Sequence, residues 1–63
     1  MKKKQEWMFV GAQVRALGRK AVITKMQETT IKGEVYVNYI TVKVDGENVA
    51  GRYHPDDVKK YEP

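Results

Sequence analysis

The chain is rich in β-branched side chains and has almost no leucine, and this imbalance limits its possible folds more than any other feature. It contains 9 valines, 3 isoleucines and 4 threonines, but only one leucine, Leu17. β-branched side chains are stiff about χ1 and pack well on a pleated surface. Leucine and alanine, by contrast, are among the strongest helix formers. We therefore predict a mostly-β fold.

The length and the cysteine content exclude several classes of protein. With 63 residues the chain forms one domain with a small core, since a domain of this size buries only about 60% of its unfolded surface. It has no cysteine and a single histidine, His54, so no disulfide, metal site or cofactor is predicted. The longest apolar run, Trp7–Val10, is too short for a membrane span or a secretory signal. We expect a cytoplasmic protein with no membrane partner.

The segment 35–44 is the most strand-like part of the sequence. Its second half places Ile40, Val42 and Val44 on one face, whereas the valines before Asn38 fall on the other face. A bulge or sharp bend near Asn38 is therefore predicted, because it would turn both sets toward one core. The second half is expected to be buried.

Four shorter strands are predicted at residues 13–17, 21–25, 47–53 and 58–61. Val14 and Ile23 are expected to face the core, and Met26 joins them only if the strand bulges nearby. An alternative helix over residues 10–21 also matches the apolar spacing. That helix would contain Gly11 and Gly18, each of which destabilises a helix by about 1 kcal/mol relative to alanine, so we favour the strand.

The predicted strands are separated by turn signals. Residues 18–20 are predicted as a turn, and Asp45–Gly46 as a two-residue hairpin turn of type I′. The polar segment 27–33 indicates a loop or the splayed tip of a hairpin. Pro55 followed by two aspartates favours one helical or 3₁₀ turn before the last strand. Residues 1–6 are predicted as a flexible basic arm.

This order of elements resembles the SH3-like small barrel found in KOW and Tudor modules. The similarity is carried by residues 9–16, by Ala21–Met26 and by the closing segment Tyr53–Tyr61. It implies a five-stranded SH3-like barrel over residues 7–63, with a 3₁₀ turn before the last strand. A weaker resemblance to type II dihydrofolate reductases implies a minimal oligomeric-pore enzyme. Of the Val-Gln-Ile-Tyr signature of that family, only Tyr53 is present here.

Positive charge and aromatic side chains suggest a ligand. The formal net charge is +4, and an Arg/Lys face with aromatic neighbours is typical of strand-based nucleic-acid binders. The predicted nucleic-acid contacts are Lys2, Lys3, Lys4, Arg15, Arg19, Lys20 and Arg52, with Lys25 and Lys43 close to them in the strands. A solvated surface of mixed charge is the simpler interpretation, because several acids are interspersed.

The aromatic residues predict either base stacking or a peptide groove. The candidates are Trp7, Tyr36, Tyr39, Tyr53 and His54. Tyrosines that cap the ends of the barrel are the structural alternative. No catalytic residue is predicted, because two adjacent aspartates beside His54 are explained by the start of a helical turn.

The favoured function is a small non-catalytic module that binds nucleic acid, of the size typical of a bacterial or phage accessory protein. The alternative is a protein-interaction module or homo-oligomer, since so small a core is often completed across an interface.

Overall fold

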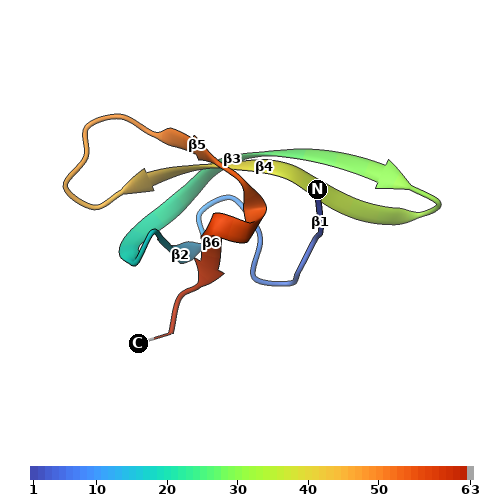
Figure 1. The fold of residues 1–63 in the computed structure, drawn as a ribbon, viewed down its shortest axis with the longest axis horizontal. Coiled ribbons are helices and arrows are strands. Elements are labelled where there is room, and N and C mark those ends of the chain that lie inside the picture. The colour runs from blue at the N-terminus through green and yellow to red at the C-terminus, as the bar shows by residue number, and fades with distance from the viewer. Residues whose placement is uncertain (63) are drawn as a thin grey trace.

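The computed structural model describes residues 1–62 and shows a curled antiparallel sheet that forms a half-barrel (Figure 1). Pro63, the last residue of the predicted domain, lies outside the described residues. The elements in chain order are β1 (Lys2–Lys3), β2 (Gln13–Ala16), β3 (Arg19–Ile31), β4 (Glu34–Val44), β5 (Gly51–Tyr53), the 3₁₀ turn η1 (Pro55–Asp57) and β6 (Val58–Lys60). The mostly-β prediction is confirmed, and residues 10–21 do not form the alternative helix.

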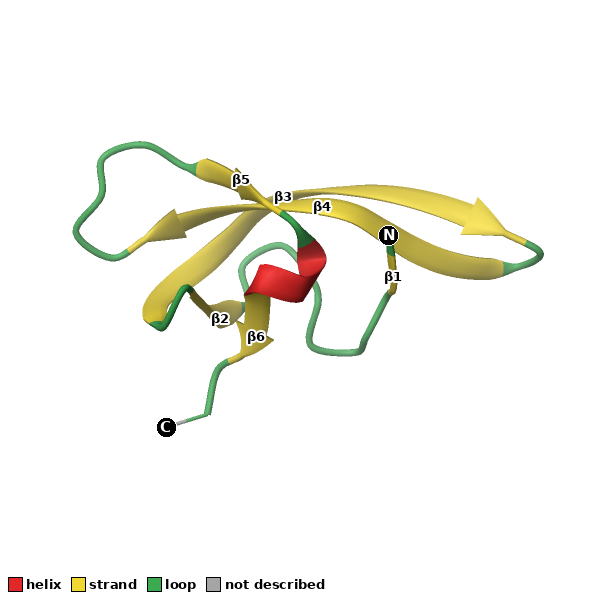
Figure 2. Ribbon diagram, viewed as in Figure 1, coloured by secondary structure: helices red, strands yellow, loops and turns green. Residues whose placement is uncertain are grey.

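The sheet is open. Its order is β1-β4-β3-β2-β6, and β5 pairs with β4 on the edge that β1 also uses. Within residues 1–62, no strand pairing joins β6 to β5 or β1, so the structure has six strands in a half-barrel where five were predicted in a barrel. The only helical element described is η1, and no helix in residues 1–62 has the length and apolar character needed to cross a membrane (Figure 2).

Two tight turns connect the three central strands. Leu17 and Gly18 join β2 to β3, and Lys32 and Gly33 join β3 to β4. All four residues have positive φ, between 50° and 80°, as a type I′ hairpin turn requires. Of the two alternatives predicted for residues 27–33, the loop is wrong, because β3 continues in pairing with β4 as far as Ile31. The segment is instead the tip of the β3–β4 hairpin, the other alternative. The turn predicted at residues 18–20 lies one residue earlier.

Leu17 is poorly suited to its turn, which leads to a first prediction. Its φ is 52° and its side chain is 70% exposed, so the strain has no compensating burial. Replacing Leu17 with asparagine, the residue that best tolerates this position before glycine, should raise the free energy of unfolding by about 0.5–1 kcal/mol. Urea denaturation followed by circular dichroism measures this. Leu17→Ala is the control, since it removes the exposed side chain but keeps the unfavourable φ; an equal gain in the control would contradict the explanation.

Two bulges bring both halves of the long hairpin onto one core. The first bulge lies in β3, between Ile23 and Lys25. The second lies in β4 at Asn38, because Gln27 pairs with Tyr39 and Glu28 pairs with Val37. The bulge predicted near Asn38 is confirmed, and it turns Val37 and the later apolar residues of β4 to the same side. The first bulge does the same for Met26, which packs against the core.

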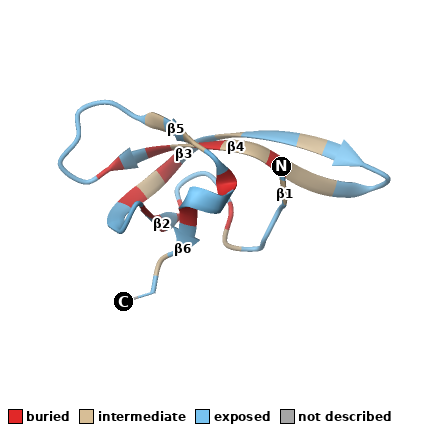
Figure 3. Cartoon of the chain, viewed as in Figure 1, coloured by how far each residue is buried: buried red, intermediate tan, exposed pale blue. Residues whose placement is uncertain are grey.

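The core lies on the inner face of the sheet, where β2, β3, β4 and β6 meet (Figure 3). The predicted core residues are confirmed: Val14, Ile23, Ile40, Val42 and Val44 are all buried. The segment between β1 and β2 closes this face and inserts the fully buried Met8. It is tied to β3 by two backbone hydrogen bonds with Ile23, from Gly11 N–H at 2.8 Å and to the Ala12 carbonyl at 3.0 Å.

Two local predictions need correction. Residues 1–6 were predicted as a flexible arm, but Lys2 and Lys3 form β1 and pair with Val37 and Tyr36 of β4. Asp45–Gly46 forms a turn closed by the Glu47 N–H and the Val44 carbonyl at 2.9 Å, but only Gly46 has positive φ. It is therefore not a type I′ turn, and the chain continues through a loop to β5, which is shorter than the predicted strand at 47–53.

Candidate nucleic-acid interface

The three N-terminal lysines each lie beside a carboxylate. The Nζ–O distances are 3.9 Å from Lys2 to Asp56, 3.3 Å from Lys3 to Glu34 and 2.8 Å from Lys4 to Glu28. β1 creates these pairs by placing the lysines along the edge of β4. Exposed ion pairs contribute little to stability, about 0–1 kcal/mol. They place a carboxylate next to each of the three lysines, which offsets the local positive charge of this segment.

Arg19 is also engaged within the protein. Its Nη1 lies 3.2 Å from Glu47 Oε1, and its Nη2 donates to the carbonyl oxygen of Asp45 at 2.9 Å. These contacts hold the loop after β4 against the start of β3. Arg19 therefore acts as a structural clamp, although the sequence suggests a ligand contact.

A row of three cations crosses the outer face of the sheet, the face opposite the core. Arg15 on β2 pairs directly with Lys20 on β3 and with Lys59 on β6. All three are exposed, whereas their neighbours Val14 and Ala16 are buried, so the row points away from the core. None of the three makes an ion pair with any residue that the structure describes.

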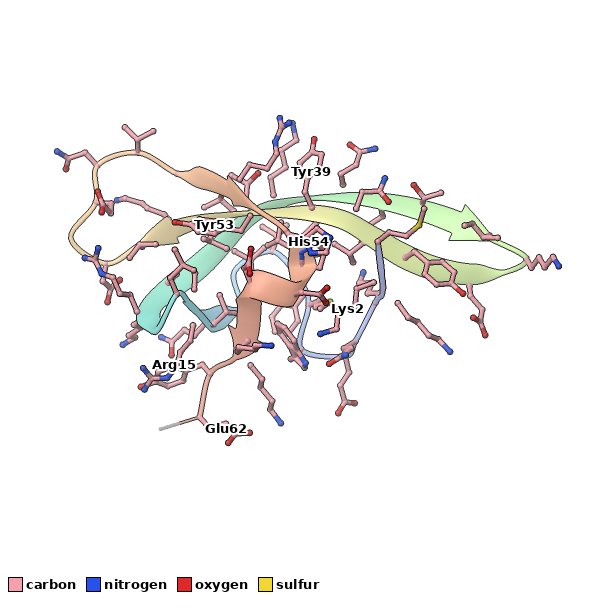
Figure 4. All side chains as sticks on the ribbon, viewed as in Figure 1. Lys2, Arg15, Tyr39, Tyr53, His54 and Glu62 are labelled. Atoms are coloured by element: carbon pink, nitrogen blue, oxygen red, sulfur yellow. The ribbon has the colours of Figure 1, made fainter. Side chains whose placement is uncertain are left out.

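The ring of Tyr61 supports this row. The Arg15 guanidinium carbon lies 5.3 Å from the ring centroid, and Lys20 Nζ lies 5.6 Å from it. Both distances are within cation–π range, so the ring holds two like charges near each other. Arg15 also donates weakly to the Gly18 carbonyl at 3.5 Å. The row is therefore a preassembled cationic cluster. Figure 4 shows its member Arg15 beside the segment that follows β6.

A second cationic group lies further along the same outer face. Thr41 on β4 pairs with Lys25 on β3 and with Arg52 on β5. The Arg52 guanidinium carbon lies 4.1 Å from the centroid of the Tyr39 ring, a close cation–π contact. Figure 4 shows Tyr39 on the side of the sheet away from η1 and the core. Lys43, two residues after Thr41 on β4, is also exposed and points to this face.

We call these six residues together the outer basic face; its members are Arg15, Lys20, Lys25, Lys43, Arg52 and Lys59. Within residues 1–62 none of them makes an ion pair. The structure thus brings together Arg15, Lys20 and Arg52 from the predicted set and leaves out Arg19 and the N-terminal lysines. Sequence reasoning missed Lys59 and Tyr61, because only the pairing of β6 with β2 places them beside Arg15.

The other predicted aromatic residues have different neighbours. Trp7 and Tyr53 are partly buried and pack against the core. The Tyr36 hydroxyl donates to Glu34 Oε2 at 3.2 Å. His54 caps η1, since its Nδ1 accepts the Asp56 N–H at 3.2 Å. The structure does not gather these four with Tyr39 into one aromatic surface.

In the part that the structure describes, no group of three or more His, Cys, Asp or Glu side chains is placed to hold a metal ion. Comparison with protein-family models gives no match, and neither curated proteins nor solved structures contain a match to this chain. The function is therefore inferred from the outer basic face itself.

Proposed function

We propose that this protein is a non-catalytic module that binds nucleic acid through the outer basic face. The observation that carries the proposal is the row of Arg15, Lys20 and Lys59 across three adjacent strands, unpaired with any carboxylate among residues 1–62. Unpaired Lys and Arg side chains neutralise phosphates and release counterions, which drives sequence-independent binding. The four carboxylates that pair with Lys or Arg in the described part of the chain lie instead beside the N-terminal lysines and Arg19.

Phosphate contacts, more than base stacking, are the expected mode of binding. Arg52 covers the Tyr39 ring at 4.1 Å, and Tyr61 is flanked by two cations. These rings position cations that can reach a phosphate backbone. Trp7 and Tyr53 contribute to the core. The proposal therefore assigns affinity to charge, with little preference for base sequence.

We also propose that the half-barrel is a variant of the SH3-like barrel. Two features support this assignment. The last strand, β6, returns to pair with β2, and a 3₁₀ turn separates it from β5. In this interpretation β1 is an addition to the five strands, laid on the edge of β4 beside β5.

The proposal is tested by fluorescence anisotropy with a labelled duplex and a labelled single strand at several salt concentrations. Each phosphate contact should contribute about 0.9 to the slope of log K against log[salt] for a duplex, and about 0.7 for a single strand. If all six cations reach phosphates, the duplex slope should be about −5. Absence of binding to both probes at about 50 mM salt, or binding that is insensitive to salt, would contradict the proposal.

A further inference from the structure

The second half of β3 has an unpaired edge. β2 pairs with β3 only from Arg19 to Val22, and Ile23 bonds to the segment before β2. From Lys25 to Ile31, β3 pairs only with β4 within residues 1–62. Figure 1 shows this part of the β3–β4 hairpin extending beyond the rest of the sheet. An exposed strand edge is a template for a further strand.

The pairing pattern shows which backbone groups face this edge. Lys4 N–H donates to the Val35 carbonyl at 2.9 Å, so that carbonyl points away from β3. Val35 is the partner of Thr30, which makes theirs a non-hydrogen-bonded pair, and the N–H and C=O of Thr30 therefore point to the free edge. Alternation along an antiparallel strand gives the same direction to Met26 and Glu28. Each of these three residues presents one donor and one acceptor.

We propose that this edge, which we call the β3 edge (Lys25–Ile31), pairs antiparallel with the β3 edge of a second copy of the chain. A two-fold axis at Glu28 places Met26 of each copy opposite Thr30 of the other and Glu28 opposite itself. All three edge-facing residues of both copies then form hydrogen-bonded pairs. A register shifted by one two-residue step places Thr30 opposite Thr24, at the bulge, or Met26 opposite Lys32, in the turn, so the centred register is favoured.

Exposed apolar residues at the two ends of the β3 edge support a second copy as the occupant. Phe9 and Val10 are 54% and 63% exposed and lie near the start of the edge, because Gly11 N–H bonds to the Ile23 carbonyl. Ile31 is 42% exposed at the other end. Antiparallel pairing brings the Ile31 end of one copy to the Phe9–Val10 end of the other. The apolar surface at both ends is then covered by the same contact.

Charge limits the strength of this contact. Glu28 would face Glu28 of the second copy, and like charges directly opposite are unfavourable. Lys4 Nζ lies 2.8 Å from Glu28 Oε1 and places a cation next to each carboxylate. We therefore expect weak, concentration-dependent association. A continuous sheet formed in this way has both outer faces on the same side, so, if the proposed function holds, one nucleic acid can contact both outer basic faces.

The first test is sedimentation velocity without nucleic acid, from about 10 µM to about 1 mM protein. The wild type should shift from monomer toward dimer over this range. Thr30→Pro should remain a monomer, because proline removes an edge donor that the β3–β4 ladder does not use. Thermal unfolding monitored by circular dichroism should show a folded variant. A wild type that stays monomeric, or a folded Thr30→Pro variant that still associates, would overturn the proposal.

The second test is disulfide trapping, which leaves the edge backbone unchanged and reports the register. The chain has no cysteine, so single substitutions are unambiguous. In the Glu28-centred register the two residues 28 lie about 5.5 Å apart between Cα atoms, within disulfide range, whereas residues 27 lie about 7–8 Å apart. Glu28→Cys should therefore cross-link faster than Gln27→Cys. Val49→Cys, 79% exposed on the loop before β5, controls for random collision.

Each outcome of the trapping experiment has a defined meaning. Faster cross-linking at 28 than at both 27 and 49 supports the pairing. Faster cross-linking at 27 overturns the register, and equal rates at 28 and 49 indicate collision without a strand pair. Because both tests omit nucleic acid, their failure would leave the proposed function of the outer basic face unaffected.

Discussion

Replacing Ile40 with alanine is expected to lower the free energy of unfolding by about 2–5 kcal/mol. Ile40 is fully buried, and its strand partners Met26 and Tyr53 both pack against the core. Removing its side chain therefore leaves a cavity between three strands. A core of this size rarely supplies more than about 3–5 kcal/mol, so the variant should be largely unfolded at 25 °C. Urea denaturation followed by circular dichroism measures the free energy of unfolding, and the spectrum without urea measures the unfolded fraction at 25 °C.

Thr41→Ala is the matched control for this experiment. Thr41 is the next residue of β4, but its side chain points to the outer face between Lys25 and Arg52. The hydrogen bond that it accepts from Thr24 Oγ1 uses its backbone carbonyl and remains in the variant. The control should change stability by no more than about 0.5 kcal/mol. A larger loss in Thr41→Ala than in Ile40→Ala would mean that the strand is shifted by one residue.

Neutralising the cationic row should weaken nucleic-acid binding strongly. The variant replaces Arg15, Lys20 and Lys59 together with glutamine, which keeps a polar, extended side chain at each position. Three lost phosphate contacts should reduce the steepness of the salt dependence by about 2–3. At about 50 mM salt the affinity should fall on the order of 10²–10³-fold. Anisotropy titrations of the wild type and the variant over the same salt series measure both effects.

A second triple variant separates the site from the net charge. Replacing Lys2, Lys3 and Lys4 with glutamine removes the same number of positive charges. Each of these lysines lies within 4 Å of a carboxylate, so their loss should affect affinity and slope much less. Equal losses in the two variants would show that net charge alone governs binding, and would remove the assignment to the outer basic face.

Part of the candidate site could be predicted from the sequence. Arg15 follows from alternation along a predicted strand, since it lies between two apolar residues that must face inward. Lys20 and Arg52 were predicted from their places in the turn after that strand and beside the Asp45–Gly46 hairpin. The contacts of Arg19 within the protein could not be predicted, because they depend on the loop after β4 lying against the start of β3. Lys59 could not be placed in the site either, because the sequence of a three-residue strand does not indicate which strand it pairs with.

The strand character of the chain, its inward-facing residues and the bulge at Asn38 could all be predicted from the sequence. These features follow from local rules: β-branched composition, a period of two, and the need to bring two apolar sets onto one core. The 3₁₀ turn at Pro55 is local in the same sense, since proline and the following aspartates favour it wherever the chain goes next.

The length of β3, the place of β1 and the neighbours of each charged side chain depend on contacts between distant parts of the chain. The polar half of β3 has no alternating pattern to detect, because it forms through its ladder with β4 and both its faces are largely exposed. No acidic partner for the N-terminal lysines can be predicted from the sequence, because the ion pairs form only when β1 lies along β4. The ion pairs of the N-terminal lysines and the pairing of β1 with β4 join residues far apart in the chain, 54 positions in the case of Lys2 and Asp56, and no local pattern encodes them.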